Sequence, residues 1–236
     1  MAVSPALTAQ TAAPAPPSPT RVQWWQGAAV LGGIAVSSAF DHAVQVWTQE
    51  NRSASSNDIA AIVRHMGQPE VFATVPLGMI GLGLVADRPA LRQAGERVTA
   101  SVLTAGVLVT GVKFLVGRVR PSQITDPYHF RPFSRSDAFP SGHTTMAFAL
   151  AAALGDEIGH PWWARAGLFG AAAATGWSRL NDNMHWLSDV VAGAALGVAS
   201  AQVMEGRWTV FHIHAPTFAT SRTSVGFRWV ISLPLP

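Results

Sequence analysis

His185 and Asp189 stand four residues apart, a spacing that would let the two side chains face each other on a helix. A carboxylate that accepts a hydrogen bond from one imidazole nitrogen fixes the tautomer and leaves the other nitrogen free to attack. Such a pair makes a histidine nucleophile, although an isolated pair of this kind is also common on protein surfaces. Asp189 opens the apolar run VVAGAALG, where a carboxylate is costly unless it has a function. The pair is therefore predicted to be catalytic.

A second cluster, Pro140-Ser141-Gly142-His143, precedes the helix-forming stretch TTMAFALAAALG. Ser141 is suited to the N-cap position of that helix, and Gly142 would let a ligand approach the backbone closely. Free N–H groups at the start of a helix bind anions, and His143 would lie in that first turn beside the anion. Taken alone, Ser-Gly is an ordinary helix entry, so the prediction of an anion site depends on the neighbouring clusters.

The third cluster runs from Lys113 to Arg120 and Pro121. Lys113 and Arg120 are seven residues apart, close to two helical turns, so both are predicted to project from one helix face. Pro121 would end that helix or fix its exit. A cationic helix end is the simpler explanation, but Lys113 is the only lysine in the chain. Arg118 would point elsewhere on the helix and is predicted to be interfacial.

In this order and spacing, the three clusters resemble the signature of the type 2 phosphatidic acid phosphatase and vanadium haloperoxidase superfamily. That signature reads Lys-x6-Arg-Pro, Pro-Ser-Gly-His and Ser-Arg-x5-His-x3-Asp. The chain has a matching residue at every signature position: Lys113, Arg120, Pro121, Pro140, Ser141, Gly142, His143, Ser178, Arg179, His185 and Asp189. The resemblance covers about residues 98–204. It implies a hydrolase of phosphoric esters or diphosphates that works through a phosphohistidine and needs no cofactor.

The resemblance also implies a role for each of these side chains. The phosphate-binding groups would be Lys113, Arg120, Ser141, Gly142 and Arg179. Arginine forks suit paired oxygens, and lysine acts as a point charge. His185 would attack phosphorus in line, oriented by Asp189, while His143 would protonate the leaving oxygen and then activate water. Three fixed cations would replace the Mg²⁺ that most phosphoryl-transfer sites need, so no metal site is expected.

The composition indicates a membrane protein or a helical protein with a very large core. Of 236 residues, 49% are hydrophobic and 12% are charged, against about 25% charged residues in average soluble domains. The absence of cysteine excludes disulfides, thiolate metal sites and cysteine nucleophiles. The net charge is +3, without a dense basic run that has aromatic residues interleaved. Nucleic acid is therefore not an expected partner, whereas membrane lipids and an anionic lipid substrate are.

Six apolar, helix-prone segments are predicted at residues 27–47, 70–86, 98–116, 144–154, 163–177 and 190–204. A membrane span needs about 20 apolar residues, with a range of roughly 17–25. The first three segments reach that range, whereas the fourth and sixth are short for a span. Residues 55–67 are predicted to form a short amphipathic helix capped by Ser56 or Asn57. The expected fold is an all-α, membrane-embedded bundle of about six helices with a short β-like C-terminal tail.

Three regions are expected along the chain. Residues 1–20 would be a disordered tail rich in alanine and proline, and residues 21–206 the helical phosphatase domain. Residues 207–236 would be a tail of short strands, because apolar and polar residues alternate there. His212 and His214 share one face of such a strand, but a lone His-x-His pattern is not enough to predict a metal site.

Charge in the loops predicts the topology. Arg88, Arg92 and Arg97 lie between the second and third apolar segments, so that turn is expected in the cytoplasm together with the N-terminus. The loops before Thr144 and after Trp177 then both fall on the external side. Because these two loops carry the clusters, we expect a multi-pass protein of a bacterial inner membrane with a periplasmic active site. The oligomeric state is left open.

The sequence leaves the substrate open among phosphatidic acid, phosphatidylglycerol phosphate and a polyprenyl pyrophosphate. The loop 122–139 and the groove between apolar helices would decide which lipid binds. Two alternatives are a soluble acid phosphatase, favoured by the short segments, and a haloperoxidase in which His185 would hold vanadate. Asp41 and His42 are unusual in an apolar segment and have no assigned role, while Asp182 and Asn183 would only shape the active-site loop.

Overall fold

The computed structural model describes residues 19–158, 161–210, 217–220 and 225–228 of the chain. Its helices are α1 (Trp24–Ser38), α2 (Asp41–Glu50), α3 (Ala54–Val63), the 3₁₀ turn η1 (Arg64–Gly67), α4 (Pro69–Phe72), α5 (Thr74–Val85), α6 (Pro89–Val116), α7 (Gly142–Glu157), α8 (Trp162–Asn181) and α9 (Leu187–Met204). Its strands are β1 (Thr20–Arg21), β2 (Trp208–Thr209), β3 (Thr217–Thr220) and β4 (Val225–Arg228). The predicted all-α bundle with short C-terminal strands is confirmed.

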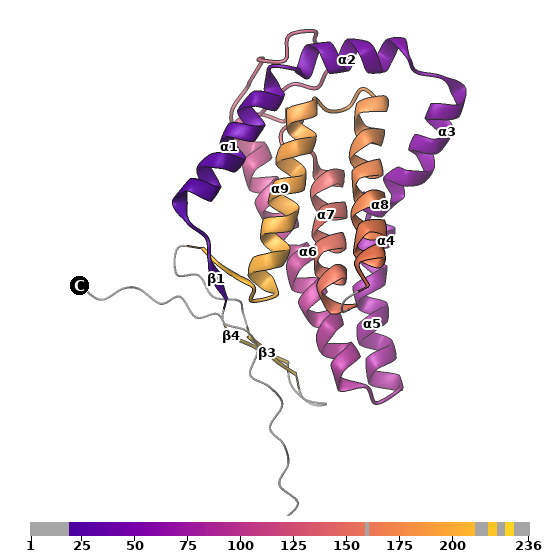
Figure 1. Ribbon diagram of the computed structural model, residues 1–236, viewed down its shortest axis with the longest axis vertical. Coiled ribbons are helices and arrows are strands. Elements are labelled where there is room, and N and C mark those ends of the chain that lie inside the picture. Colours follow the sequence, from indigo (N-terminus) through magenta and orange to yellow (C-terminus); the bar gives the residue numbers. More distant parts are fainter. Residues whose placement is uncertain (1–18, 159–160, 211–216, 221–224, 229–236) are drawn as a thin grey trace, which may run out of the picture.

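Helix α7 forms the centre of the bundle and packs against α6, α8 and α9 (Figure 1). Small residues let these helices approach closely. A Cβ atom added at Gly197 of α9 would lie 2.3 Å from the Thr145 carbonyl oxygen of α7, so only glycine fits at this crossing. Around it, alanines of α7 such as Ala149 and Ala153 are fully buried beside Val98 and Leu150. The core is therefore built from alanine and glycine more than from large side chains.

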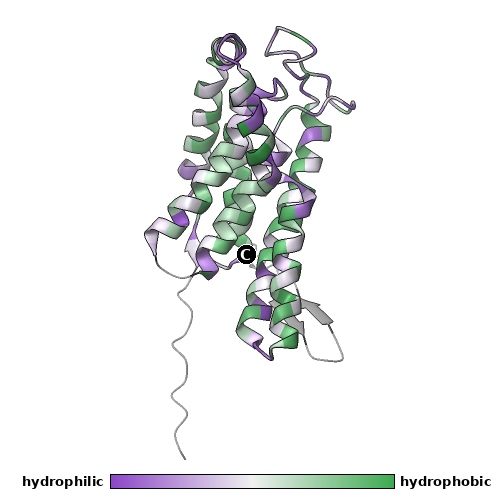
Figure 2. Cartoon of the chain, turned by 90° about the vertical axis from the view of Figure 1, so that its right-hand side faces the viewer, coloured by the Kyte–Doolittle hydropathy of each residue, from purple (hydrophilic) through white to green (hydrophobic). Residues whose placement is uncertain are grey.

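The bundle is embedded in a membrane. In the described part of the chain, α6 and α9 are long and apolar enough to cross a membrane, and two bent helix pairs raise the number to four if each pair forms one span. The outward faces of the bundle are apolar as well, with Val85, Leu103 and Val107 all more than half exposed. Figure 2 shows hydrophobic residues along the middle of the helices and hydrophilic residues gathered at their ends. Lipid would cover these outward faces.

Two of the predicted helices are broken. The segment predicted at 27–47 bends by 52° between α1 and α2, where the Ser37 and Ser38 hydroxyls bond back to carbonyls of α1. The segment predicted at 70–86 is interrupted at Ala73 and bends by 46°. Pro76 has no N–H to donate to the carbonyl four residues earlier, so α4 cannot continue into α5 as a regular helix. The hydropathy of the sequence does not indicate either break.

The ends of other helices also differ from the prediction. Helix α6 begins at Pro89 rather than near residue 98, so Arg92 and Arg97 belong to the helix and not to a turn. It ends at Val116 and is capped by Gly117, whose left-handed conformation (φ 59°) closes the helix four residues before Pro121. Helix α3 is capped by Ser53, whose hydroxyl accepts a hydrogen bond from the Ser56 N–H, and not by Ser56 or Asn57.

The strands are short. β1 pairs with β2 in parallel, which joins Thr20 and Arg21 to the residues after α9. β3 and β4 pair as an antiparallel ribbon. Residues 1–18, most of the tail predicted at 1–20, lie outside the described residues, as do His212 and His214.

Candidate active site

The three clusters of the sequence meet at one end of the bundle, where α6 and α8 end and α7 and α9 begin (Figure 1). Lys113 lies in the last turn of α6 and Arg179 in the last turns of α8. His143 is the second residue of α7, and His185 lies two residues before α9. Lys113, Arg120, Arg179 and His185 all lie within electrostatic reach of His143. The spatial convergence that the motifs require is therefore present.

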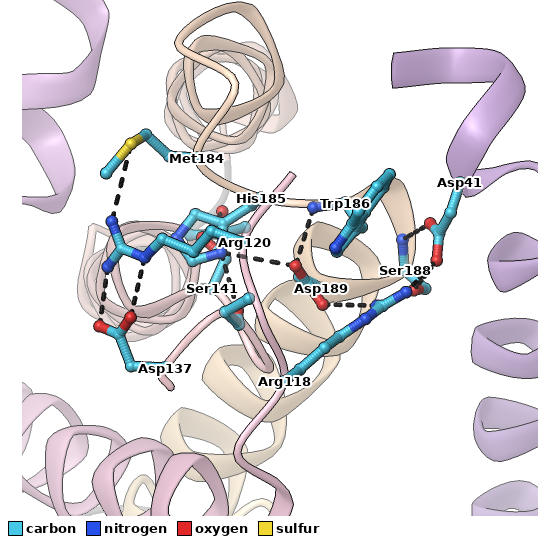
Figure 3. Close-up of polar contacts among 12 residues, drawn as sticks. Asp41, Arg118, Arg120, Asp137, Ser141, Met184, His185, Trp186, Ser188 and Asp189 are labelled. Carbon is cyan, nitrogen blue, oxygen red and sulfur yellow. Dashed lines mark hydrogen bonds and ion pairs between the residues drawn. The ribbon is translucent and has the colours of Figure 1, made fainter. Parts of the chain in front are cut away.

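His185 is buried, with only 4% of its surface exposed. Its Nδ1 atom lies 2.7 Å from the Ala138 carbonyl oxygen and 3.6 Å from Oδ2 of Asp189. Since both neighbours are acceptors, Nδ1 carries the proton and Nε2 keeps its lone pair. The role predicted for Asp189 in fixing the tautomer is therefore shared with the backbone carbonyl of Ala138, which is the nearer acceptor. Figure 3 shows the ring between Asp189 and Arg120.

The predicted helical pairing of His185 with Asp189 is also replaced by a capping arrangement. Helix α9 begins only at Leu187, so His185 lies in the loop before it. Asp189 is the third residue of the helix, and its Oδ2 atom accepts from the Trp186 N–H at 2.8 Å. The two side chains are close because the carboxylate turns back over the helix start.

Burial lowers the pKa of the His185 imidazole, and the nearby charges of Lys113 and Arg179 lower it further. Asp189 acts in the opposite direction but does not compensate for the loss of water. The ring is therefore neutral in the folded chain at pH 7. A neutral imidazole with a free Nε2 is the form that can act as a nucleophile.

Two of the predicted cations converge on a residue that the motifs do not include. Arg120 binds Asp137 through two hydrogen bonds, from Nε at 2.8 Å and from Nη2 at 2.7 Å (Figure 3). The Lys113 ammonium donates to the Asp137 carbonyl oxygen and lies 3.9 Å from its carboxylate. The prediction of one shared helix face is wrong, because α6 ends at Val116 and Arg120 lies in the following loop. The loop nevertheless folds back so that Arg120 and Lys113 both contact Asp137.

Burial raises the pKa of the Asp137 carboxyl, but the hydrogen bonds from Arg120 and the charge of Lys113 outweigh that effect. The pKa of Asp137 therefore lies below its usual value, and the group is an anion at neutral pH. A carboxylate thus lies between two cations at the position where a phosphoryl group would need them.

The third predicted cation, Arg179, is held by the carboxylate of Asp182. Its Nη1 atom donates to Asp182 at 2.8 Å, which gives Asp182 a definite partner in the active-site loop. Asp182 also lies 3.5 Å from Nη1 of Arg64, at the start of η1. The Nε atoms of Arg179 and Arg64 are buried and have no partner among the described residues. Both guanidinium groups therefore keep donor capacity for an anion.

The start of α7 approaches these cations closely. A Cβ atom at Gly142 would lie 3.6 Å from Cε of Lys113. Ser141 occupies the N-cap position as predicted, but its hydroxyl accepts from the Thr144 hydroxyl at 2.9 Å instead of from the helix backbone. At Gly67, a Cβ atom would lie 2.4 Å from the His143 carbonyl oxygen, so η1 packs directly against the histidine backbone.

Arg118 and Asp41 differ most from their predicted places. Arg118 is not interfacial, because only 2% of its surface is exposed and it bonds to Asp189 and Asp41. Asp41, which had no assigned role, is fully buried as its partner. The sequence carried two weak signals for this pair: a carboxylate inside an apolar segment, and a second arginine beside the motif residue Arg120. By contrast, Asp137 and Arg64 are in stretches without any pattern that could have found them.

The comparisons with known proteins agree with this geometry. Residues 97–211 match the family model described as the PAP2 superfamily. The lipid A 1-phosphatase of Porphyromonas gingivalis is 37% identical over 105 residues, which are 44% of this chain and 21% of that protein. The chain thus spans about a fifth of the length of that relative.

Two solved structures have the same fold. The transmembrane PAP2-type phosphatidylglycerolphosphate phosphatase of Bacillus subtilis aligns with a TM-score of 0.61 at 20% identity, over 77% of this chain and 95% of that one. LpxE of Aquifex aeolicus aligns with a TM-score of 0.54 at 22% identity, over 69% of this chain and 92% of that one. At these identities, the likeness concerns the fold. The family match covers residues 97–211, just under half of the chain, and this stretch carries the complete set of motif residues at one end of the bundle. This part of the chain is therefore similar to the PAP2 superfamily.

Proposed function

We propose that the protein is a metal-independent lipid phosphatase that hydrolyses a phosphate monoester or a diphosphate through a phosphohistidine. The observation that supports this most directly is the orientation of His185. Its Nδ1 atom faces two acceptors, so Nε2 is free to attack, and three cations of the signature surround the same place. Lys113, Arg120 and Arg179 would stabilise the charge of the phosphoryl oxygens in the transition state.

The reaction has two steps. In the first, Nε2 of His185 forms a bond to phosphorus while the bond from phosphorus to the leaving oxygen breaks, and His143 donates its proton to that oxygen. The His185 ring retains its Nδ1 proton and becomes cationic. In the second, water attacks phosphorus, its proton passes to His143, and the electron pair of the N–P bond returns to Nε2. His143 must therefore be protonated when the first step begins, and it is protonated again after the second. Burial and the nearby cations lower the pKa of His143 to about 4, and the negative charge of a bound phosphoryl group would offset those cations and favour the protonated ring.

No metal ion is needed in this scheme, because the three cations supply the positive charge that Mg²⁺ supplies in many phosphoryl-transfer sites. The first turn of α7 adds N–H donors from Gly142 and its neighbours, whose partners would be phosphoryl oxygens. Ser141 would donate its hydroxyl hydrogen to a phosphoryl oxygen while it continues to accept from Thr144.

An apolar groove that starts at η1, the turn that packs against His143, supports a lipid substrate. It has a volume of about 540 Å³ and lies between α4, α5, α7 and α8, with Met66 of η1 at one end and Trp163 at the other. Residues such as Val75 and Leu154 line it. Since η1 packs against His143, an acyl or prenyl chain in the groove would bring its phosphate toward the cations. Arg64 lies at the same end and would contact the lipid headgroup.

The names of the similar proteins suggest which lipids to test. One is a lipid A 1-phosphatase and another a phosphatidylglycerolphosphate phosphatase. Phosphatidic acid and a polyprenyl diphosphate carry the same phosphoryl group on other lipids. These four lipids are the candidate substrates.

The proposed location is a bacterial inner membrane, with the active site at the periplasmic face. The turn between α5 and α6 lies at the opposite end of the bundle from the loops that carry Asp137 and His185 (Figure 1). That turn is flanked by Arg88 and Arg92, which supports its placement in the cytoplasm.

Phosphate release by the purified full-length protein in detergent micelles tests the function. The four lipids would be assayed in parallel with EDTA present, and a vanadate-dependent bromide oxidation assay would test the haloperoxidase alternative. We expect phosphate release from at least one lipid, undiminished by EDTA, and none from the His185→Ala variant. Turnover by His185→Ala at near wild-type rate would rule out the proposed nucleophile, and complete inhibition by EDTA would rule out metal independence.

A further inference from the structure

A buried arginine joins two carboxylates behind the active site. Arg118 donates from Nη1 to Oδ1 of Asp189 at 2.7 Å and from Nη2 to Oδ2 of Asp41 at 2.6 Å. Both carboxylates are fully buried, and the arginine is 2% exposed. Asp41 is 77 residues away from Arg118 in the sequence and belongs to α2, whereas Arg118 lies in the loop after α6. Charges buried this deeply must be paired, because a single unpaired member would be strongly destabilising.

The guanidinium of Arg118 has no donor left for a substrate. Nε and Nη2 also donate to the Pro127 carbonyl oxygen, at 2.9 and 2.6 Å, and Nη1 donates to the Ser188 hydroxyl at 2.7 Å. These contacts and the two carboxylates satisfy all five N–H groups. Arg118 therefore differs from Arg120 and Arg179, which face the place of the phosphoryl group. Its function must be exerted through Asp189 and Asp41.

Asp41 also holds the beginning of α9. Its Oδ1 atom accepts from the Ser188 backbone N–H at 2.7 Å, and Oδ2 accepts from the Ser188 hydroxyl at 2.6 Å. A carboxylate at a helix start is stabilised by the partial positive charge of the free N–H groups. Helix α2 contacts the loop between α8 and α9 as well, since Gln45 donates to the Asn183 side chain at 3.0 Å. This helix thus covers the segment that presents His185.

The contacts form one continuous chain from α2 to the histidine (Figure 3). Asp41 binds Arg118, Arg118 binds one oxygen of Asp189, and the other oxygen of Asp189 lies 3.6 Å from Nδ1 of His185. We propose that Arg118 and Asp41 are positioning residues, which fix the Asp189 carboxylate and thereby the tautomer and orientation of the His185 ring. The part of this proposal that concerns catalysis rests on the proposed phosphohistidine function.

The charges of Asp41, Arg118 and Asp189 also affect the stability of the cationic His185 ring. Two carboxylates and one guanidinium leave one net negative charge next to Nδ1, and the ring becomes cationic when Nε2 bonds to phosphorus. The other charged groups that face His185 are Lys113 of α6, Arg179 of α8 and Asp137 of the loop before α7. Two of those three are cations, which disfavour a cationic ring. Asp189 and Asp41 are needed to offset them.

The test compares Asp41→Asn with Thr48→Ala in the full-length protein. Asn keeps the shape of Asp41 but removes its charge. Thr48 is a matched control because it is buried on the same helix and its hydroxyl donates to the Val44 carbonyl of that helix. We expect Asp41→Asn to slow phosphoenzyme formation at least tenfold with less than a twofold change in KM, since the three cations are unchanged. Thr48→Ala should stay within twofold of wild type in both constants.

A second measurement determines the tautomer of the His185 ring directly and does not depend on catalytic activity. Ring-nitrogen NMR of the histidine-labelled protein, assigned with His185→Gln, distinguishes the two neutral tautomers. The wild type should show Nδ1 protonated, while Asp41→Asn and Arg118→Lys should show a mixture. If Asp41→Asn keeps a single Nδ1–H tautomer and the wild-type phosphorylation rate, the positioning role is wrong. A fall in melting temperature with kcat and KM changing together would equally overturn it in favour of a purely structural role.

The two proposals can fail separately. If the wild type releases no phosphate from any lipid but loses the single tautomer on Asp41→Asn, the function is wrong and the positioning role stands. If the wild type is active and both measurements are unchanged by the substitution, the positioning role is wrong and the function stands.

Discussion

Arg120 and Asp137 face each other in a two-pronged ion pair, with Nε and Nη2 of the arginine 2.8 and 2.7 Å from the two carboxylate oxygens. The same aspartate lies beside Lys113. A phosphoryl group that binds between these two cations must therefore displace a carboxylate of the protein. Under the proposed function, Asp137 would compete with the substrate anion for these two cations.

Replacing Asp137 with asparagine should strengthen the binding of inorganic phosphate. Asparagine keeps the size of the side chain but leaves the charges of Arg120 and Lys113 uncompensated. Because Asp137 is 45% exposed, solvent screens the pair, and we expect a gain of about three- to tenfold in affinity. Isothermal titration calorimetry measures it. Asp126→Asn, in the same loop, is the control, and weaker phosphate binding by Asp137→Asn would contradict the competition.

The pKa of His185 predicts how the protein responds to acid. Burial lowers this pKa in the folded chain, whereas an unfolded histidine titrates with a pKa of about 6.5. As the pH falls below that value, the unfolded chain binds the proton first, so this residue makes the folded state less stable toward acid. The ring itself stays neutral to a lower pH. NMR of the ring signals should show no titration of His185 between pH 8 and 6.5, and a midpoint at or above 6.5 would contradict this.

The role of His143 can be separated from that of His185 by the leaving group. If His143 protonates the leaving oxygen, His143→Ala should lose most of its activity on an alkyl phosphate but far less on an aryl phosphate whose leaving group is already acidic. A loss of about 10²- to 10⁴-fold is typical when a general acid is removed. Rapid-quench measurement of phosphoenzyme formation with both substrates tests it. An equal loss on the two substrates would exclude His143 as the general acid.

The motifs could be predicted from the sequence because their chemistry is local. Each motif can be recognised from a few neighbouring residues: Lys113 with Arg120, the tetrapeptide from Pro140 to His143, and the pair of His185 and Asp189. The order of the three motifs along the chain then identified the family that they resemble. Apolar stretches likewise predicted the helical bundle, since hydropathy reports burial in lipid or protein core without regard to contacts.

The partners of these residues could not be predicted, because they come from distant parts of the chain. Asp41 meets Arg118 only after α2 has folded across the end of α9, and no spacing relates the two positions. The error about Arg118 has the same cause. The sequence favoured a helix that continues to Pro121, whereas Gly117 ends it earlier and turns the following residues inward. A glycine in an apolar segment does not by itself predict a left-handed residue that ends the helix.

The crossing of α7 and α9 should tolerate no side chain at Gly197. A Cβ atom there would meet the Thr145 carbonyl oxygen at 2.3 Å and the Ala149 nitrogen at 2.9 Å, both backbone atoms that cannot move independently. Gly197→Ala should therefore destabilise the protein by about 1–3 kcal/mol. Gly111→Ala, on α6 with nothing within 4 Å, should be neutral or slightly stabilising. Thermal unfolding in detergent compares them, and equal melting temperatures would refute the close packing.

The absence of cysteine makes the proposed topology directly testable. Single cysteines at Ala90, near the turn between α5 and α6, and at Thr125, in the loop before α7, would be exposed at opposite ends of the bundle. In intact cells, a membrane-impermeant maleimide should label Thr125→Cys and leave Ala90→Cys unlabelled until the membrane is permeabilised. Labelling of both without permeabilisation would show that the two ends are not separated by a bilayer. The reverse pattern would place the histidines in the cytoplasm, where a substrate on the outer leaflet could not reach them.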